Sequence, residues 1–220
     1  MTNPNINIQT IQTKRYPCML LDPAWPMQQK TGSRGAGRHY PLLTLDQIKS
    51  LPVASLADPD SSHCWLWVTN AALRYGYEVL EAWGFTPMSI LTWVKPRYGL
   101  GQYIRNASEH ILLGVRGNAP AMFHGQSSWF MAPLQRHSEK PQEIYDIIER
   151  ISPGPRLELF ARKRRHGWDA WGLDVPSDIF IPRFPVPTYT FSSAALAQTA
   201  GTLLYKANTA TNNDTRNGDE

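Results

Sequence analysis

The sequence predicts an α/β domain built on a mainly parallel sheet. From Tyr16 to about Val175, short apolar runs rich in β-formers alternate with segments of helical periodicity. Hydrophobic residues make up 42% of the 220 residues, which is enough for one sizeable core and short of two ordinary domains. We therefore expect a loose N-terminus at 1–14, a folded domain at 15–175, and a tail at 176–220. The tail is proline-rich and then polar, which indicates partial disorder.

The first elements are a strand and a short helix. The apolar run Tyr16–Leu21 predicts a buried strand that opens into a loop at Asp22-Pro23. Residues 27–39 are rich in glycine and basic residues and predict a mobile loop. Thr44 and Gln47 form a capping-box pattern, which predicts a helix as far as about Ser50.

The middle of the chain predicts three strands and one helix. The strands are expected at 63–69, 88–94 and 111–115, with a long loop at 95–108. We expect Asn70 to be the N-cap of the helix and Gly84 to follow its end. The residues that share its apolar face are Leu73, Tyr77, Leu80 and Trp83.

The last part of the domain predicts one helix and one strand. An irregular stretch is expected at 117–136, and a helix opens near Pro141 as its first residue. A strand follows at 156–160, and then a basic, tryptophan-containing loop at 161–174. The apolar face of the helix consists of Ile144, Ile147, Ile148 and Ile151.

Net charge, cysteine pattern and the length of apolar runs narrow the classes of protein to which the chain can belong. The formal net charge is +4, which suits a polyanionic partner without demanding one. Cys18 and Cys64 belong to no CxxC pair or His/Cys cluster, so we expect reduced thiols, no metal site and a cytoplasmic protein. No apolar run is long enough for a signal peptide or a membrane span, so we expect no membrane partner.

Asp22-Pro23-Ala24-Trp25, at the carboxyl end of the first predicted strand, is the sharpest feature for chemistry. Ligands of open α/β sheets bind outside the carboxyl ends of the strands. The Asp22 carboxylate and the Pro23 carbonyl can accept both N–H groups of a poorly nucleophilic amine such as that of adenine. Trp25 can stack on an extruded base. Alone, however, these residues also fit an Asp-Pro turn beside a core tryptophan.

The chain resembles the MT-A-seventy (MT-A70) family of adenine N6-methyltransferases. That family includes the catalytic subunit of the messenger-RNA adenosine methyltransferase and bacterial and phage relatives. The resemblance covers roughly Tyr16 to Asp174. The segments that carry it, in order, are LLDPAW, HYPLLT, CWLWVTN, EAWGF, WVK, EHILLGVRGN, HSEKPQEIYDIIERISPG and LELFARKRRHGWDAWG.

The resemblance implies a Rossmann-like, S-adenosylmethionine-dependent methyltransferase fold in circularly permuted order, with the catalytic motif before the cofactor strand. It implies that Glu158 and Arg162 hold the ribose of S-adenosyl-L-methionine, although Glu158 alone also fits an ion pair with a nearby arginine. It places the backbone around Leu159 and Asp174 by the cofactor's adenine. Asp22 is implied to meet the amino group of the methionine moiety.

Two residues depart from the family pattern. Ala24 replaces the second proline of the motif, and Leu173 replaces an asparagine that follows Gly172 in the family. Ala24 lowers the rigidity of the loop but removes no hydrogen-bond acceptor, so we still expect activity. Leu173 puts the adenine contact at that position in doubt.

Further positions match the family at its ligand and substrate segments. His137 and Ser138 precede a helix N-terminus, where they fit the methionine carboxylate, a phosphate, or only a helix cap. Tyr40 matches an aromatic of the substrate loop and equally fits a core tyrosine. Basic residues in the loops predict a phosphate-binding rim or merely a solvated face; those assigned to the substrate are Lys30, Arg34, Arg38, Arg105 and Arg164.

The sequence as a whole predicts an adenine N6-methyltransferase of nucleic acid, with DNA favoured because compact members are mostly bacterial or phage proteins. Two alternatives stay open. One is an RNA substrate with the same chemistry, and the other is a catalytically silent nucleic-acid-binding subunit. A homodimer or a partner subunit is compatible with the short chain, since no separate target-recognition domain is evident.

Overall fold

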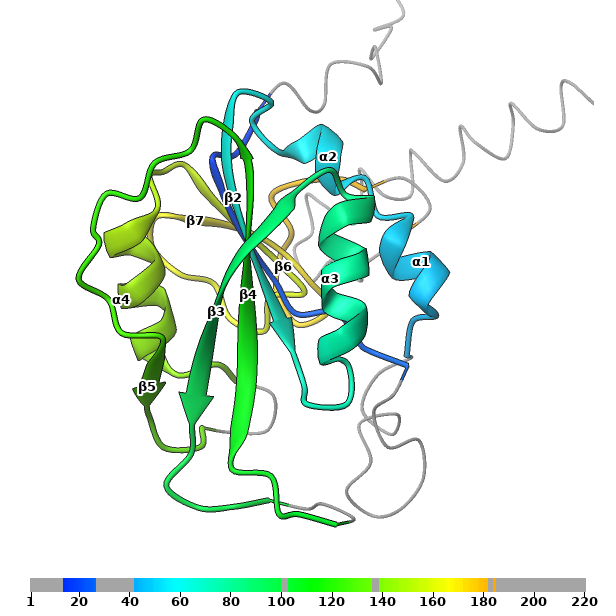
Figure 1. Cartoon of the computed structure of the whole chain (residues 1–220). Helices are drawn as coiled ribbons and strands as arrows, with labels where there is room; N and C mark the ends of the chain where they lie inside the picture. The colour runs from blue at the N-terminus through cyan, green and yellow to red at the C-terminus, as the bar shows by residue number, and fades with distance from the viewer. Residues whose placement is uncertain (1–13, 27–41, 100–102, 136–138, 182–183, 185–220) are drawn as a thin grey trace, which may run out of the picture.

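A computed structural model describes residues 14–26, 42–99, 103–135, 139–181 and 184. These residues form one seven-stranded sheet with helices on both faces (Figure 1). The strands are β1 (Cys18–Leu21), β2 (Ser61–Val68), β3 (Thr86–Val94), β4 (Ser108–Gly117), β5 (Trp129–Met131), β6 (Arg156–Leu159) and β7 (Trp168–Trp171). The helices are α1 (Leu45–Lys49), α2 (Val53–Leu56), α3 (Leu73–Ala82) and α4 (Gln142–Ile151).

The strand order is β5-β3-β4-β2-β1-β6-β7. The pairs β1–β2, β1–β6, β6–β7 and β3–β5 are parallel, whereas β4 is antiparallel to both β2 and β3. The predicted, mainly parallel sheet is therefore confirmed. Because only β4 runs the other way, the other strands all end at the same edge of the sheet, here called the carboxyl edge. It is the lower end of the sheet in Figure 1.

Two hydrophobic layers enclose the sheet. The helices α1, α2 and α3 cover one face, and α4 covers the other (Figure 1). The predicted apolar face of α4 is confirmed, since all four of its isoleucines are buried. Burial of each such side chain contributes about 1.5–3 kcal/mol, so the amphipathic face rather than intrinsic propensity holds this helix in place.

The predicted capping box is confirmed at α1. The Thr44 hydroxyl accepts from the Gln47 backbone N–H, and the Gln47 side chain accepts from the Thr44 backbone N–H. α4 begins at Gln142, with Pro141 as its N-cap, one position before the predicted role of Pro141 as the first helical residue.

The prediction for the start of α3 was wrong. The helix begins at Leu73 with Ala72 at the N-cap, and Asn70 is not a cap. Instead, the Asn70 amide donates to Asn106 and bonds His110, so it ties the end of β2 to the β3–β4 connection. Gly84 does follow the helix end with a φ of +78°, as predicted. Tyr77 is 40% exposed, so it does not belong to the buried face.

Two stretches predicted to be irregular contain strands. β5 lies within 117–136, and β7 lies within 161–174. Both are short edge strands that pair on one side only, with β3 and with β6 respectively. Such strands are specified by pairing partners more than by their own pattern, which is why the sequence did not indicate them.

Among the described residues, no helix is long and apolar enough to cross a membrane.

Candidate active site

The chain leaves the carboxyl edge of the sheet through the loops that follow β1, β2, β3, β6 and β7. Asp22 is the first residue after β1, which lies between β2 and β6 in the middle of the sheet. Its side chain is 24% exposed, so the carboxylate is reachable while its surroundings are largely buried. The structure therefore places this carboxylate where open α/β sheets bind their ligands.

Backbone hydrogen bonds fix the turn after β1. The Pro23 carbonyl accepts from the Trp25 N–H at 2.9 Å, and the Ala24 carbonyl accepts from the Leu43 N–H at 2.9 Å. The second bond brings the chain back beside the turn after the intervening segment. Because a carbonyl oxygen has two lone pairs, Pro23 keeps the capacity to accept one further hydrogen bond.

Trp25 does not have the stacking position that the sequence suggested. Its side chain is fully buried in the core on the α3 side of the sheet, and its Nε1–H donates to the Trp67 carbonyl at 2.9 Å. The ring thus anchors the turn to β2 and presents no face to a base. The alternative of a core tryptophan beside an Asp-Pro turn describes this residue correctly.

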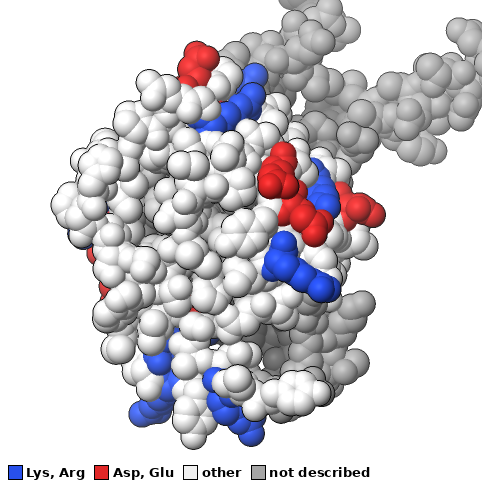
Figure 2. Space-filling view, in the orientation of Figure 1, with Lys and Arg blue, Asp and Glu red and all other residues white. Residues whose placement is uncertain are grey.

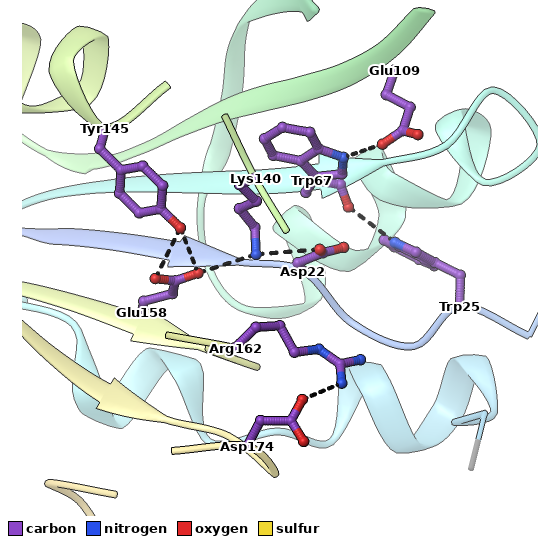
Figure 3. Close-up of polar contacts among 9 residues, drawn as sticks. All are labelled: Asp22, Trp25, Trp67, Glu109, Lys140, Tyr145, Glu158, Arg162 and Asp174. Carbon is purple, nitrogen blue, oxygen red and sulfur yellow. Dashed lines mark hydrogen bonds and ion pairs between the residues drawn. The ribbon is translucent and has the colours of Figure 1, made fainter. Parts of the chain in front are cut away.

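Lys140, immediately before α4, lies between two carboxylates (Figure 3). Its Nζ is 3.2 Å from Asp22 Oδ2 and 3.1 Å from Glu158 Oε1. The Tyr145 hydroxyl donates to Glu158 at 3.0 Å. Lys140 and Glu158 side chains are each only 3% exposed. Two carboxylates share one ammonium, so this cluster keeps one net negative charge.

For both Asp22 and Lys140, burial and ion pairing shift the pKa in opposite directions. Burial raises the pKa of the Asp22 carboxyl, and the nearby Lys140 ammonium opposes that rise without cancelling it. Burial lowers the pKa of Lys140, but the charges of Asp22 and Glu158 outweigh burial and raise it. The ammonium therefore keeps its proton, and Asp22 is a more basic carboxylate than an exposed aspartate.

A second polar group borders Asp22. The Trp67 Nε1–H donates to Glu109 Oε2 at 2.6 Å, and Lys95 pairs with the other oxygen of Glu109. These residues come from β2, β4 and the end of β3, and Figure 3 shows Glu109 on the far side of Trp67 from Glu158. The Glu109 charge contributes to the raised pKa of Asp22.

The loops after β6 and β7 meet at the same edge. Arg162 donates to Asp174 at 2.6 Å, and both side chains are partly exposed. Phe160 has a φ of +65°, which is strained for a residue other than glycine and turns the chain sharply away from β6. A Cβ at Gly172 would lie 2.1 Å from the Ala161 carbonyl oxygen, so only glycine permits this close approach of the two loops.

The sequence profile of the MT-A70 family matches residues 16–174. The chain belongs to the MT-A70 family. The mixed α/β sheet is consistent with the fold of S-adenosylmethionine-dependent methyltransferases, and this family is one of N6-adenine methyltransferases.

Individual relatives agree with the family. The human N(6)-adenosine-methyltransferase catalytic subunit METTL3 is 33% identical over 158 residues, which cover 67% of this chain and 26% of METTL3. The MT-A70-like N(6)-adenosine-methyltransferase of Drosophila melanogaster is 32% identical over 158 residues, 67% of this chain and 24% of the fly protein. The chain thus spans about a quarter of these relatives. It covers 82% of the Type II methyltransferase M.MunI of Mycoplasma sp, with 29% identity over 192 residues and 77% of this chain.

The structure brings together several residues that the MT-A70 resemblance assigned to the cofactor. Asp22 and Glu158 share Lys140, and Arg162 and Asp174 pair with each other. The Leu159 side chain is buried in the core. The partner of Glu158 is a lysine rather than the arginine considered from the sequence.

The predicted substrate residues fall into three groups. Arg105 is exposed in the β3–β4 connection at the carboxyl edge, where Figure 2 shows Lys and Arg side chains gathered at the lower end of the molecule. Arg164 instead bonds Asp178 and the Pro176 carbonyl and lines a pocket at the opposite edge. Arg164 belongs to the loop that joins the parallel strands β6 and β7. This loop starts at the carboxyl edge and returns to the opposite edge of the sheet, so its later residues lie far from Asp22. Outside the described residues lie the other predicted substrate residues, Lys30, Arg34, Arg38 and Tyr40, and two residues predicted to bind the cofactor, His137 and Ser138.

Sequence reasoning missed three residues that the structure places in the site. Lys140 and Tyr145 belong to the segment HSEKPQEIYDIIERISPG, and Glu109 opens EHILLGVRGN, but no role was assigned to them. The signals available in the sequence were a lysine beside the proline that opens a helix and a tyrosine among isoleucines. Neither signal identifies a partner, because Asp22 and Lys140 are distant in sequence and meet only in the fold.

Proposed function

We propose that this protein transfers a methyl group from S-adenosyl-L-methionine to the N6 amino group of adenine in nucleic acid, with DNA as the preferred substrate. One observation carries the proposal. In a chain of the MT-A70 family, a partly exposed Asp22 carboxylate stands at the carboxyl edge of the central strand and is held by the buried Lys140 ammonium.

The chemistry of the site fits the cofactor. S-adenosyl-L-methionine carries a sulfonium, an ammonium and a carboxylate, so it has one net positive charge. The Asp22–Lys140–Glu158 cluster offers one net negative charge, with a cation and an anion side by side. Asp22 would hold the ammonium of the methionine moiety, and Arg162 and Glu158 the ribose. When bound, the cofactor supplies the electrophilic methyl group.

The residues after β1 orient the amine of the substrate. The Asp22 carboxylate accepts one N–H, and the Pro23 carbonyl accepts the other with its remaining lone pair. These bonds would draw the nitrogen lone pair out of conjugation and aim it at the methyl group for in-line displacement, in which the N–C bond forms as the sulfonium S–C bond breaks and leaves a neutral thioether. The proton that the amine loses would pass to the Asp22 carboxylate or to water. The turn is already fixed by its bonds to Trp25 and Leu43, which compensates for the alanine at position 24.

A stacking partner for the extruded base comes from a residue other than Trp25. Tyr98 and Tyr103 are exposed aromatic rings in the loop that follows β3 at the carboxyl edge. Exposed rings near basic side chains such as Arg97 are typical of surfaces that stack unpaired bases. We assign the stacking role to this loop.

The order of the strands supports the permuted fold. β1, with the catalytic turn, comes first in the chain, whereas β6, with Glu158, comes near its end, yet the two strands are direct neighbours in parallel register. A cofactor strand that follows the catalytic strand in sequence and adjoins it in space is what a circular permutation of a Rossmann-like sheet requires.

The choice among substrates rests on the relatives of the chain. The preference for DNA rests on the interpretation that compact members are mostly bacterial or phage proteins, and on the match to most of the length of M.MunI. The RNA alternative rests on the similarity to METTL3, named as an N(6)-adenosine-methyltransferase. The presence of Asp22 argues against a silent subunit, since that role needs no amine acceptor.

The test is methyl transfer from labelled cofactor to duplex DNA, single-stranded DNA and RNA, followed by nucleoside analysis. We expect N6-methyladenine in DNA, and a loss of about 100-fold or more in kcat for Asp22→Asn, which keeps the shape but not the charge of the acceptor. The matched control is Asp46→Asn, an exposed carboxyl in the first turn of α1. Absence of N6-methyladenine from every substrate, with cofactor bound, would overturn the proposal.

A further inference from the structure

A basic pocket of about 520 Å³ lies at the edge of the sheet opposite to Asp22. Arg156 opens β6 and pairs in register with Trp168, which opens β7, so both mark the amino ends of parallel strands. The charged and titratable residues that line the pocket are Lys14, Arg156, Arg164, Arg165, His166 and Asp169. The pocket therefore opens away from Asp22, and four basic side chains and one carboxylate line it.

Two acidic groups near this pocket, Asp169 and Asp178, are paired with cations, and a third, Glu149, accepts from the pocket-lining Trp168 Nε1 at 2.7 Å. Asp169 accepts from Lys14 and from the Tyr16 hydroxyl, the latter at 2.6 Å. Asp178 pairs with Arg164 at 2.8 Å. Asp169 and Asp178 thus each have a cation of their own.

Arg156 and Arg165 are held by neutral groups. Arg156 Nη2 donates to the carbonyls of Glu149 and Ser152 at 3.2 and 3.0 Å. The Arg165 guanidinium lies 3.5 Å from the centroid of the Tyr145 ring and also bonds Gln142. Within the described part of the chain, neither guanidinium has a carboxylate within ion-pair distance, and the Nε–H of each is buried without an acceptor.

Two fixed guanidinium groups without counter-charges, which line one pocket, match the chemistry of a phosphate. Guanidinium presents several N–H donors in a planar fork that fits phosphate oxygens, and a side chain already held in place loses little entropy on binding. We propose that this pocket binds a phosphate group, supplied either by a nucleic-acid backbone or by a free phosphate compound. Phosphate binding requires no methyl transfer, so this proposal can be tested independently of the proposed function.

The first experiment measures binding of a labelled DNA single strand to the full chain without cofactor, across a range of salt concentrations. We compare wild type with Arg165→Gln and Arg156→Gln. If a nucleic-acid backbone supplies the phosphate, each variant should weaken binding about tenfold. Each should also reduce the slope of log affinity against log salt by about 0.7, the value for one lost phosphate contact on a single strand. The matched control is Arg116→Gln, which removes an arginine that does not line the pocket and should leave the slope unchanged.

The second experiment uses only wild-type protein, so it is independent of the folding of the variants. Arginines are modified with phenylglyoxal, and the reaction of Arg156 and Arg165 is followed by peptide mass spectrometry with and without ligand. Protection by the DNA strand alone assigns the pocket to a nucleic-acid backbone. Protection by inorganic pyrophosphate assigns it to a free phosphate compound. DNA binding by both pocket variants at the wild-type level excludes the nucleic-acid backbone as the source of the phosphate. The proposal is overturned if neither ligand protects these two arginines.

Discussion

Two buried polar clusters lie at the two ends of α4, and they differ in charge. Before the first turn, Lys140 joins Asp22 and Glu158 at the carboxyl edge of the sheet. After the last turn, the Ser152 hydroxyl accepts from Trp65 Nε1 at 2.9 Å and lies 2.8 Å from His63 Nδ1. His63 Nε2 lies 2.9 Å from the Ala119 carbonyl. The first cluster is ionic, and the second satisfies its members as neutral groups.

The two clusters differ in the free-energy cost of their burial, and that difference separates a functional site from a structural one. Burial of an ion pair in place of apolar residues rarely stabilises a fold, so a buried lysine between two carboxylates indicates a function at that place. A neutral cluster in which every donor has an acceptor costs little and serves the packing of α4 against β2. The two ends of one helix thus separate a functional cluster from a structural one.

The largest effect should come from Lys140→Met. Loss of the ammonium leaves Asp22 and Glu158 as two uncompensated carboxylates, and the free energy of unfolding should fall by about 3–5 kcal/mol. Chemical denaturation measures this change. The control is Lys49→Met, which removes the surface pair with Glu78 and should cost less than about 1 kcal/mol. Equal losses in the two variants would show that the ionic cluster is no more costly to break than a surface pair.

Ser152→Ala should have the next largest effect, and it tests the neutral cluster. Trp65 Nε1 loses its acceptor and His63 loses one partner in a buried environment, so the free energy of unfolding should fall by about 1–3 kcal/mol. Ser55→Ala, which removes an exposed hydroxyl, should change it by less than about 0.5 kcal/mol. A loss as large as that of Lys140→Met would remove the distinction between the two clusters.

The pH dependence of stability should identify His63 as a neutral group. Burial lowers its pKa below the ordinary value of 6.5. As the pH falls through that ordinary value, the unfolded chain takes up a proton and the folded chain does not, so stability falls by up to about 1.4 kcal/mol per pH unit. The contribution is fully present above the ordinary value. Thermal unfolding of wild type and His63→Gln across this range should show a smaller acid-side loss in the variant, and parallel curves would contradict the prediction.

The smallest effect concerns the pH profile of the reaction. Burial, together with the charges of Glu109 and Glu158, raises the pKa of Asp22, so the rate should rise with pH around a midpoint above that of an ordinary aspartate. Glu158→Gln removes one of these charges and should move the acid limb of kcat/KM to lower pH. A purely structural role for Glu158 would lower the rate at every pH and leave the limb where it is.

Much of the fold followed from local pattern. The capping box at Thr44, the isoleucine face of α4 and the apolar strands all appeared where periodicity placed them, because each is specified by neighbouring residues. The edge strands β5 and β7 were not predictable, since their main specification is the strand beside them. Asparagine is a common N-cap residue, but the Asn70 side chain donates a hydrogen bond to the β3–β4 connection instead.

The sequence by itself determined the family, the turn after β1 and the carboxylate of Asp22, since these depend on ordered motifs and on the carboxyl end of a strand. Only the tertiary structure decided that Trp25 is an anchor, that Lys140 joins Asp22 to Glu158, and that Arg164 faces the opposite edge. The physical reason is distance along the chain. A motif states which groups are present, whereas the charge state and exposure of each group depend on partners that only folding brings within reach.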